Sequence, residues 1–298
     1  MPKPLIKRVR NFTLYLIIQF LRGVFFIIPW AARIWVGKTL GTFARLVMKK
    51  QKKIILKNFE LAYGNKLDAV AREKLLKENF THYGISVFEF MKCSTLSAIK
   101  VAALVTEFEG AQYLDEAKAA GKGVIAVTAH LGNWEILPLF IAVRGYKAGA
   151  VGKKLFDERI DTIVNGSRRR QGVMIFDRDS APIAMIKELK KGLVLGLLVD
   201  QDTNVDSVFV PFLGKIAKTP SAPALMAKKF DYPLVTIFIT RRPDGKYKVT
   251  VNKPIEIKAE DTPESIATAY NKEISDAIYA QPEQWVWLHD RWKSPPIN

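Results

Sequence analysis

The sequence predicts an α/β fold: a mostly parallel sheet flanked by helices, with an antiparallel hairpin added and a membrane-anchoring helix at the N-terminus. Short apolar, β-branched runs alternate with helical patterns between residues 111 and 199, which is typical of parallel sheets. A Pro-Asp-Gly turn lies between two strand-like runs within residues 234–257 and indicates the hairpin. An apolar segment surrounded by basic residues opens the chain and predicts the anchor.

The first 60 residues carry most of the positive charge. The formal net charge of the chain is +17, and this segment holds thirteen Lys or Arg against one acid, Glu60. Basic residues beside a strongly apolar stretch are typical of a segment held at an anionic membrane surface. Because the other residues include 33 basic and 28 acidic ones, the charge does not indicate a nucleic acid partner. We therefore expect a membrane-anchoring segment over residues 1–60 and a catalytic domain over residues 61–298.

The apolar stretch over residues 11–36 predicts an anchoring helix with one polar stripe. Arg22 and Arg33 interrupt it, so it lacks an unbroken apolar run of about 18 residues. At about 100° per residue, six polar residues fall in one sector: Arg8, Asn11, Tyr15, Gln19, Arg22 and Arg33. We expect this stripe to face the catalytic domain or the lipid headgroups, and Pro29 to kink the helix. A buried core helix, a single span and a shallow re-entrant insertion are the alternatives.

A long helix and an alternating region come next. The helix is predicted over residues 67–92, with His82 in a structural role. Its inward positions are predicted to be Leu75, Phe80, Tyr83, Val87 and Phe90. The alternating region is predicted to contain helices over 111–120, 135–143, 156–169 and 182–191, and strands over 124–128, 148–151, 173–176 and 193–199.

Capping signals predict two later helices. Thr219 before Pro220 is typical of an N-cap followed by proline at the first helical position, and it predicts a helix to residue 230. Asp261 and Glu264, with proline between them, predict a last helix that ends before Pro282.

The segment from Gly123 to Glu135 is the most informative part of the chain, because a buried strand leads directly to His130. Open α/β sheets place their ligands at the carboxyl ends of strands. An imidazole readily takes a proton from a hydroxyl at neutral pH, and a carboxylate fixes its tautomer. We therefore expect His130 to be a general base and Glu135 its orienting carboxylate. The alternative is a histidine that only hydrogen-bonds the backbone.

Metal and disulfide chemistry have little support. The chain has one cysteine, Cys93, so it has no internal disulfide, and its three histidines do not show metal-ligand spacing. Cys93 ends a helical pattern and is expected to be a packed thiol. We expect neither a metal nor a cofactor.

Four sequence blocks together carry a resemblance: HLGNWE at 130–135, SRRRQG at 167–172, VDQD at 199–202 with FVPFLG at 209–214, and PEQWVWLHDRWK at 282–293. In this order they resemble the lipid A secondary acyltransferases, the lauroyl and myristoyl transferases of Gram-negative bacteria, within the lysophospholipid acyltransferase superfamily. The resemblance implies that His130 and Glu135 are catalytic. It also implies transfer of a fatty acyl group from acyl carrier protein to a hydroxyl of a lipid A precursor or related glycolipid, at the cytoplasmic face of the inner membrane.

Four further residues are candidates for substrate binding: Asn133, Arg168, Arg170 and Asp200. Arg168 suits an acceptor phosphate or a developing oxyanion, because its guanidinium is planar and donates twice. Asp200 is expected to orient Arg168 or a substrate hydroxyl. A solvated helix cap at the three arginines and a turn at Asp200 are the alternatives. Trp285 and the two later tryptophans are expected to pack in the core or near the membrane.

Other functions remain open. Acyl transfer from a thioester needs a base, an oxyanion stabiliser and a site that excludes water. A serine-hydrolase route is disfavoured, because the chain has no Gly-x-Ser-x-Gly motif. An acyltransferase for another glycolipid or a lysophospholipid and a lipid thioesterase are the enzymatic alternatives. A membrane- or nucleic-acid-binding protein without catalysis is the alternative of another class, and it leaves the HLGNWE segment unexplained.

Overall fold

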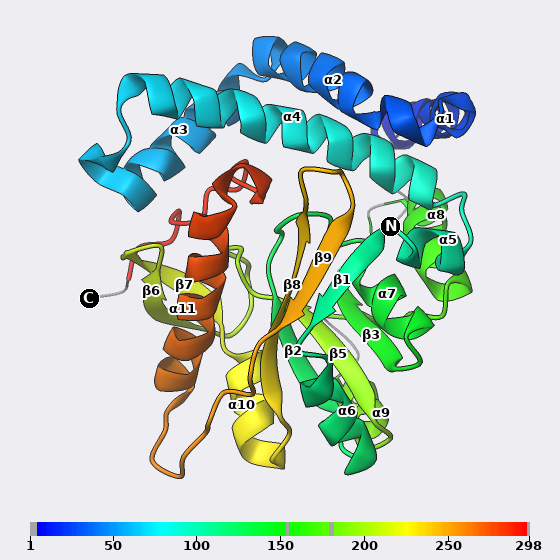
Figure 1. The fold of residues 1–298 in the computed structure, drawn as a ribbon. Helices are drawn as coiled ribbons and strands as arrows, with labels where there is room; N and C mark the ends of the chain where they lie inside the picture. The colour runs from blue at the N-terminus through cyan, green and yellow to red at the C-terminus, as the bar shows by residue number, and fades with distance from the viewer. Residues whose placement is uncertain (1–4, 153–154, 156, 179–181, 297–298) are drawn as a thin grey trace.

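A seven-stranded sheet forms the centre of the molecule, and helices pack on both of its faces (Figure 1). The computed structural model describes residues 5–152, 155, 157–178 and 182–296. The strand order is β1-β9-β8-β2-β5-β3-β4, and adjacent strands are parallel except for the β8–β9 pair. The strands are β1 (Val105–Glu109), β2 (Val124–Thr128), β3 (Lys147–Gly152), β4 (Met174–Asp177), β5 (Leu193–Leu198), β8 (Leu234–Arg241) and β9 (Tyr247–Val251). The predicted mostly parallel sheet is confirmed.

The predicted antiparallel hairpin is the β8–β9 pair, in which Ile237 lies opposite Val251 and Arg241 lies opposite Tyr247. Gly245 has a φ of 75° in the connecting turn, a conformation that glycine adopts without a steric penalty. The sequence did not predict β1, which lies parallel to β9 at the edge of the sheet.

A second hairpin contradicts one predicted helix start. Strands β6 (Ser207–Phe212) and β7 (Lys215–Pro220) form a separate antiparallel pair. The prediction that Thr219 caps a helix is wrong, because Thr219 lies in β7 opposite Val208. Helix α10 (Ala222–Phe230) begins after Ser221 instead. Strand pairing therefore outweighs the local capping signal here.

The remaining helices largely follow the sequence prediction. Between the strands lie α6 (Ala111–Ala119), α7 (Leu137–Val143), α8 (Glu158–Arg170) and α9 (Pro182–Leu189). Phe156, at the predicted start of α8, lies outside the described residues. Helix α11 (Pro263–Ala280) is capped by Thr262, whose hydroxyl accepts a hydrogen bond from the backbone N–H of Ser265 at 3.2 Å. The cap is thus one residue later than predicted.

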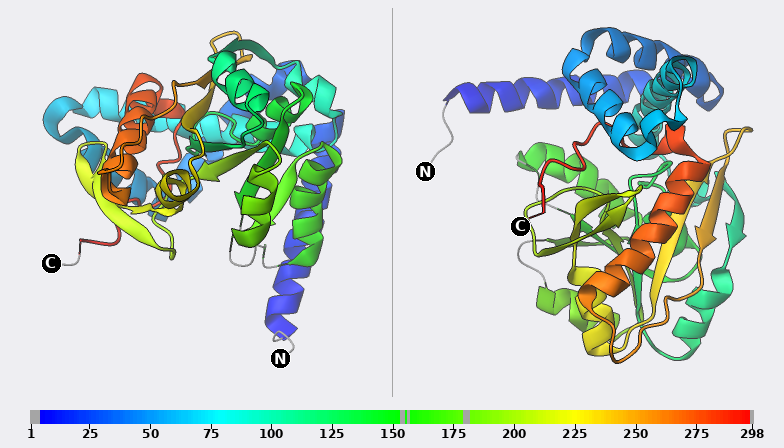
Figure 2. Two further views of the ribbon diagram at one scale, coloured as in Figure 1. Left: turned by 90° about the horizontal axis from the view of Figure 1, so that it is seen from below. Right: turned by 90° about the vertical axis from the view of Figure 1, so that its left-hand side faces the viewer.

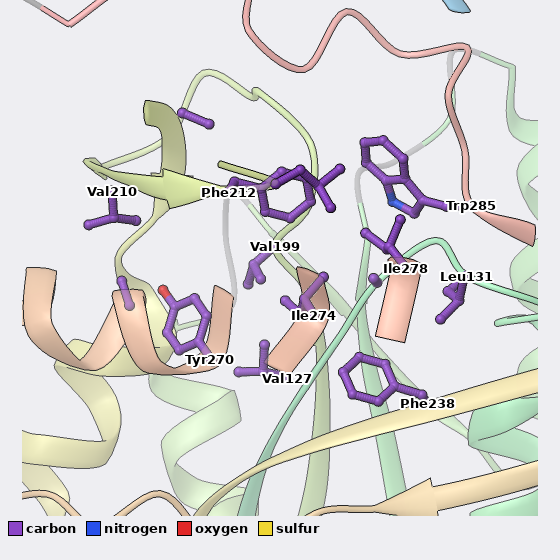
Figure 3. Packing of buried hydrophobic residues seen from close by; sticks show 14 of the residues in the cluster. Val127, Leu131, Val199, Val210, Phe212, Phe238, Tyr270, Ile274, Ile278 and Trp285 are labelled. Atoms are coloured by element: carbon purple, nitrogen blue, oxygen red, sulfur yellow. The ribbon is translucent and has the colours of Figure 1, made fainter. Parts of the chain in front are cut away.

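Alternate residues of β2 face two separate cores. Ile125 and Val127 point to the core that includes α11, where Figure 3 shows Val127 beside Ile274. Val124 and Ala126 point to the core that includes α7. All five residues of β2 are buried, as expected for a strand covered on both faces. The carboxyl end of β2, which leads to His130, is therefore held at the centre of the fold.

Among the described residues, five α-helices precede the sheet: α1 (Leu5–Ile27), α2 (Arg33–Val47), α3 (Lys49–Tyr63), α4 (Ala69–Cys93) and α5 (Ala98–Ala102), the last of which was not predicted. The predicted anchoring helix is divided near Pro29, where a short 3-10 helix (Trp30–Ala32) separates α1 from α2. The segment Ile6–Ile27 is long and apolar enough to cross a membrane, judged by length and composition alone. Figure 2 shows α1 extending away from the rest of the molecule. Large exposed apolar side chains lie on both α1 and α2, among them Ile6, Phe20, Ile27, Trp35, Phe43 and Leu46.

The polar stripe contacts the rest of the protein. Arg22 donates through Nε to Ser94 Oγ at 3.3 Å and through Nη1 to Gln19 Oε1 at 2.8 Å. Arg33 donates to the carbonyl oxygen of Asp244, in the β8–β9 turn, at 3.3 Å. Both arginines therefore face protein groups.

Helix α4 packs closely against α2 through glycines. A Cβ atom built on Gly84 would lie 2.2 Å from the carbonyl oxygen of Gly37, so no larger side chain fits without movement. Leu75 and Phe80 of α4 are buried in the core that also includes Ile55 and Phe59 of α3. The prediction that Val87 points inward is wrong, since 45% of this residue is exposed.

Candidate active site

His130 lies in the loop after β2 and contacts Asp200, which follows the neighbouring strand β5. The distance between His130 Nδ1 and Asp200 Oδ1 is 2.8 Å, and the backbone N–H of His130 donates to Asp200 Oδ2, also at 2.8 Å. Because β2 and β5 are parallel neighbours, their carboxyl ends bring the two residues together at one edge of the sheet. The carboxylate that contacts the imidazole is thus Asp200, whereas the sequence predicted Glu135.

The contact with His130 keeps the Asp200 carboxyl group ionised and orients the imidazole ring. The carboxyl group of Asp200 is fully buried, and burial alone would raise its pKa. The hydrogen bonds from the side chain and backbone of His130 and from Trp285, with the charge that His130 carries when it is protonated, outweigh burial and lower the pKa of Asp200 below its usual value. A carboxylate accepts hydrogen bonds, so Nδ1 of His130 carries the proton and Nε2 is left as the atom that can take one. The His130 side chain remains 18% exposed, which leaves it accessible to a substrate.

Glu135 forms an ion pair with Arg168 of α8. Arg168 Nη2 lies 2.6 Å from Glu135 Oε1, and Arg168 Nε lies 3.0 Å from Oε2. A third donor, Arg168 Nη1, contacts Asn165 Oδ1 at 2.8 Å. Two carboxylates near the loop therefore have separate partners: Asp200 contacts His130, and Glu135 contacts Arg168. The expectation that Asp200 orients Arg168 is not met by these contacts.

Asn133 and Arg170, two of the predicted substrate-binding residues, lie in environments that differ from each other. Asn133 is buried, and its Nδ2 donates to Glu89 Oε2 at 3.0 Å. Arg170 is exposed in the last turn of α8, where a positive charge interacts favourably with the helix dipole. The structure thus brings Arg168, but neither Asn133 nor Arg170, into contact with a predicted catalytic residue.

Glu89 is a buried acid that the sequence analysis missed. Its Oε2 atom accepts hydrogen bonds from Asn133, from Arg241 Nη2 at 2.6 Å and from the Tyr247 hydroxyl. Burial is the largest cause that raises the pKa of Tyr247 well above its usual value, so the hydroxyl stays protonated and donates. The sequence signal was an acid between two phenylalanines in a helix, where Glu89 follows Phe88. This network holds the loop after His130 from the side of α4.

His82 supports the same loop. Its Nε2 donates to the carbonyl oxygen of Gly132 at 3.2 Å, and its Nδ1 accepts a hydrogen bond from Arg241 Nη1 at 2.6 Å. Burial and the charge of Arg241 lower the pKa of His82 well below its usual 6.5, although the contact with Gly132 opposes this. A neutral imidazole can accept at Nδ1 while it donates at Nε2, which is what these partners require.

An apolar cavity lies beneath α7, beside the loop that carries His130. Four positions with small or absent side chains form its floor on three adjacent strands: Ala126, Ala148, Ala150 and Gly196. Glu135 and Arg168 line its polar end, and Trp134 lines it as well. The ring of Trp134 lies 5.0 Å from the ring of His130, so the cavity and the imidazole share a wall.

A C-terminal strap, residues 282–290, completes the site. Leu131 forms an isolated β-bridge with Trp285, and the backbone N–H of Val286 donates to the carbonyl oxygen of His130 at 3.1 Å. The indole of Trp285 donates to Asp200 Oδ2 at 2.7 Å. The sequence predicted a packing role for Trp285, and its one signal for a role at the site was the place of Trp285 in the fourth sequence block.

Comparison with known proteins gives consistent matches over most of the chain. The sequence model of the bacterial lipid A biosynthesis acyltransferases matches residues 2–294. The chain is 29% identical to the lipid A biosynthesis lauroyltransferase of Escherichia coli (strain K12) over 276 residues, covering 90% of this chain and 88% of that enzyme. It is 24% identical to the lipid A biosynthesis palmitoleoyltransferase of the same organism over 283 residues, covering 91% and 88%. It is 23% identical to a phosphatidylinositol mannoside acyltransferase of Mycobacterium tuberculosis over 229 residues, covering 75% and 72%.

Proposed function

Because the chain belongs to the bacterial lipid A biosynthesis acyltransferase family, we propose that it moves a fatty acyl group from acyl carrier protein to a hydroxyl of a lipid A precursor. The observation that carries this proposal is the contact between His130 and Asp200, at the carboxyl edge of the sheet and beside an apolar cavity. The reaction takes place at the cytoplasmic face of the inner membrane.

His130 is the general base in this proposal. Its Nε2 takes the proton of the acceptor hydroxyl while the hydroxyl oxygen attacks the thioester carbonyl carbon. Asp200 keeps the proton on Nδ1 and stabilises the imidazolium that forms. When the tetrahedral intermediate collapses, the carbon–sulfur bond breaks and the imidazolium returns its proton to the leaving thiolate. The products are an ester and a free thiol, and His130 is regenerated.

Arg168 supplies positive charge beside the cavity. The paired Glu135 fixes the guanidinium in one orientation at the polar end of the cavity. Such a group suits either the oxyanion of the intermediate or a phosphate of the acceptor, because both carry negatively charged oxygen that accepts hydrogen bonds from N–H donors. Glu135 thus acts on the reaction through Arg168.

The cavity beneath α7 takes the fatty acyl chain. Its floor of alanine and glycine leaves room for hydrocarbon, and its walls are mostly apolar. Trp134 lines the cavity and contacts His130, so an acyl chain in this cavity would place its carbonyl group near the imidazole. Filling the cavity with hydrocarbon also excludes water from the thioester.

Helix α1 holds the enzyme on the membrane. Exposed apolar side chains such as Phe20 and Ile27 favour lipid, and the basic residues of α3 favour anionic headgroups. This location suits an acceptor that is itself held in a bilayer. An acidic donor protein would also be attracted by the basic surface.

Mass spectrometry of lipids tests the proposal. Cells that express the wild-type chain are expected to contain a lipid A precursor one acyl chain heavier than in cells with His130→Ala. With purified protein, acyl carrier protein thioesters and coenzyme A thioesters are compared as donors, with and without the acceptor. Hydrolysis of the thioester without transfer to any acceptor would identify a thioesterase and refute the proposal. Acylation of another glycolipid in place of the lipid A precursor would keep the mechanism and replace the substrate.

A further inference from the structure

Trp285 touches the proposed catalytic pair from outside the substrate cavity. We infer that Trp285 is a positioning residue, whose indole N–H fixes the Asp200 carboxylate in the orientation that meets His130. This inference rests on the proposed function of His130, because positioning is measured as its effect on the reaction.

Within the part of the chain that the structure describes, three donor atoms reach the Asp200 carboxylate. Its Oδ1 atom faces His130 Nδ1 at 2.8 Å, and its Oδ2 atom accepts from the backbone N–H of His130 at 2.8 Å and from Trp285 Nε1 at 2.7 Å. Asp200 is fully buried, so solvent does not replace a donor that is lost. Without the indole N–H, the carboxylate can rotate and weaken its contact with Nδ1. Trp285 is therefore placed to control the geometry of the pair without meeting a substrate.

Trp285 is itself held firmly. Its carbonyl oxygen accepts hydrogen bonds from Asn79 Nδ2 at 2.9 Å and from the Tyr83 hydroxyl at 3.1 Å, both on α4. Its ring lies 5.5 Å from the ring of Phe212, and Figure 3 shows these two rings next to each other. A side chain restrained at its backbone and its ring can impose its geometry on a neighbour.

Two buried asparagines hold the C-terminal strap at alternate carbonyl groups. Asn79 of α4 donates to the carbonyl oxygens of Glu283 and Trp285, both at 2.9 Å. Asn58 of α3 donates to those of Trp287 at 2.9 Å and His289 at 2.7 Å. Each asparagine amide thus donates the hydrogen bonds that the backbone of a neighbouring strand would supply to the carbonyl groups of a regular strand. The strap connects helices α3 and α4 with Asp200 through Trp285.

Trp287 provides a matched comparison within the strap. It is also fully buried, and its indole donates to the carbonyl oxygen of Pro282 at 2.7 Å. Its donor atom has a backbone partner, whereas that of Trp285 has Asp200. If Trp285 only packed in the core, Trp→Phe changes at the two positions would alter the protein in the same way.

The test compares Trp285→Phe with Trp287→Phe in the purified full-length enzyme. Each change is expected to lower the melting temperature, because each leaves a cavity and a lost hydrogen bond. Only Trp285→Phe is expected to lower kcat, by about 10-fold, with KM for donor and acceptor unchanged, since a hydrogen bond to a charged group is lost. Equal kcat values in the two variants would overturn the inference.

A second measurement asks whether Trp285 acts through Asp200. In an Asp200→Asn background, adding Trp285→Phe is expected to lower kcat by less than about 2-fold, because coupled residues are not additive. A full 10-fold further loss in that background would overturn the inference.

Two controls distinguish a wrong inference from misfolding of the variant and from failure of the proposed function. If Trp285→Phe does not fold, site-specific replacement of Trp285 by 3-benzothienylalanine keeps the ring shape and removes only the N–H donor, and the same loss of kcat is expected. Unchanged kcat in that protein would overturn the inference. The wild-type enzyme measured in parallel tests the proposed function separately, because its transfer activity does not depend on the outcome for Trp285.

Discussion

Glu135 forms a two-point ion pair with Arg168, although it lies only five residues after His130 in the chain. The carboxylate that contacts His130 comes from Asp200, 70 residues away. The two acids therefore have different effects on the proposed reaction. Asp200 orients His130, the proposed base, and Glu135 orients the guanidinium of Arg168 beside the cavity.

Asp200→Asn is expected to lower kcat by about 10²–10⁴-fold, the range for loss of general base catalysis. An asparagine amide can donate to Nδ1 and so leave the proton on Nε2, where it blocks uptake of the substrate proton. Glu135→Gln is expected to cost less, because the amide oxygen can still accept from Arg168. Steady-state kinetics of both variants check this ranking. A larger loss in Glu135→Gln than in Asp200→Asn would assign the base's partner to Glu135 after all.

Arg168→Lys is expected to remain strongly defective, because a lysine ammonium does not reproduce the planar, two-point contact of a guanidinium. The exposed neighbour Arg169 provides the control, since Arg169→Lys also keeps the charge and is expected to be fully active. Separate kcat and KM values distinguish the roles: a lower kcat indicates oxyanion stabilisation, and a raised acceptor KM indicates phosphate binding. Full activity of Arg168→Lys would mean that charge alone is sufficient.

Gly196→Val is expected to shift the preferred acyl chain to a shorter length. Among the described residues, a Cβ atom on Gly196 would meet the carbonyl oxygen of Gly149, 3.3 Å away, and no other atom within 4 Å, so the added methyl groups enter the cavity with a small shift of that backbone. Competition between donors of different chain length, followed by mass spectrometry of the product, measures the preference. Leu195→Ile, on the other face of β5, is the control and should leave the preference unchanged. An unaltered preference in Gly196→Val would place the acyl chain elsewhere.

His82→Gln is expected to reduce the loss of stability on acidification. Burial, with the charge of Arg241, lowers the pKa of His82 in the folded protein well below 6.5. Below pH 6.5 the unfolded chain therefore binds a proton that the folded chain does not. The free energy of unfolding thus decreases as the pH is lowered. A single such group contributes a slope of up to about 1.4 kcal/mol per pH unit.

Denaturant unfolding at pH 7.5, 6.5 and 5.5 measures this slope. His289→Gln is the comparison, because the pKa of His289 is also lowered by burial, but this residue is only partly buried. The slope should decrease more in His82→Gln than in His289→Gln. Identical slopes in wild type and His82→Gln would show that another group causes the acid sensitivity.

Deleting residues 1–28 is expected to release much of the protein from membranes. The deletion removes α1 and leaves α2, which packs on α4 through Gly37 and Gly41. Activity on bilayer-held acceptor should fall more than activity on detergent-dispersed acceptor, because the anchor brings enzyme and lipid together. Sedimentation with membranes checks the first expectation. Unchanged sedimentation would place the anchor on the exposed side of α2 or in the basic run that begins at Lys49.

Local sequence patterns were sufficient to predict much of the fold. The alternation of apolar runs and helical periods predicted most of the parallel strands. The Pro-Asp-Gly turn that ends at Gly245 predicted the β8–β9 hairpin. His130 was located at a strand end for the same reason, because the period of the apolar residues changes there. These features depend on neighbouring residues, whose spacing is visible in the chain itself.

Tertiary packing determined which residues contact Asp200 at the proposed active site. The contact of Asp200 with His130 joins residues 70 apart, and that with Trp285 joins residues 85 apart, so both depend on which strands and segments lie side by side. Thr219 shows the same effect, since pairing with β6 replaced the helix start that its local sequence favoured. Short-range propensities contribute only tenths of a kcal/mol per residue, whereas burial and pairing of a whole segment contribute several. The sequence by itself therefore determined where His130, the proposed base, lies in the fold, and only the tertiary structure determined which carboxylate meets it.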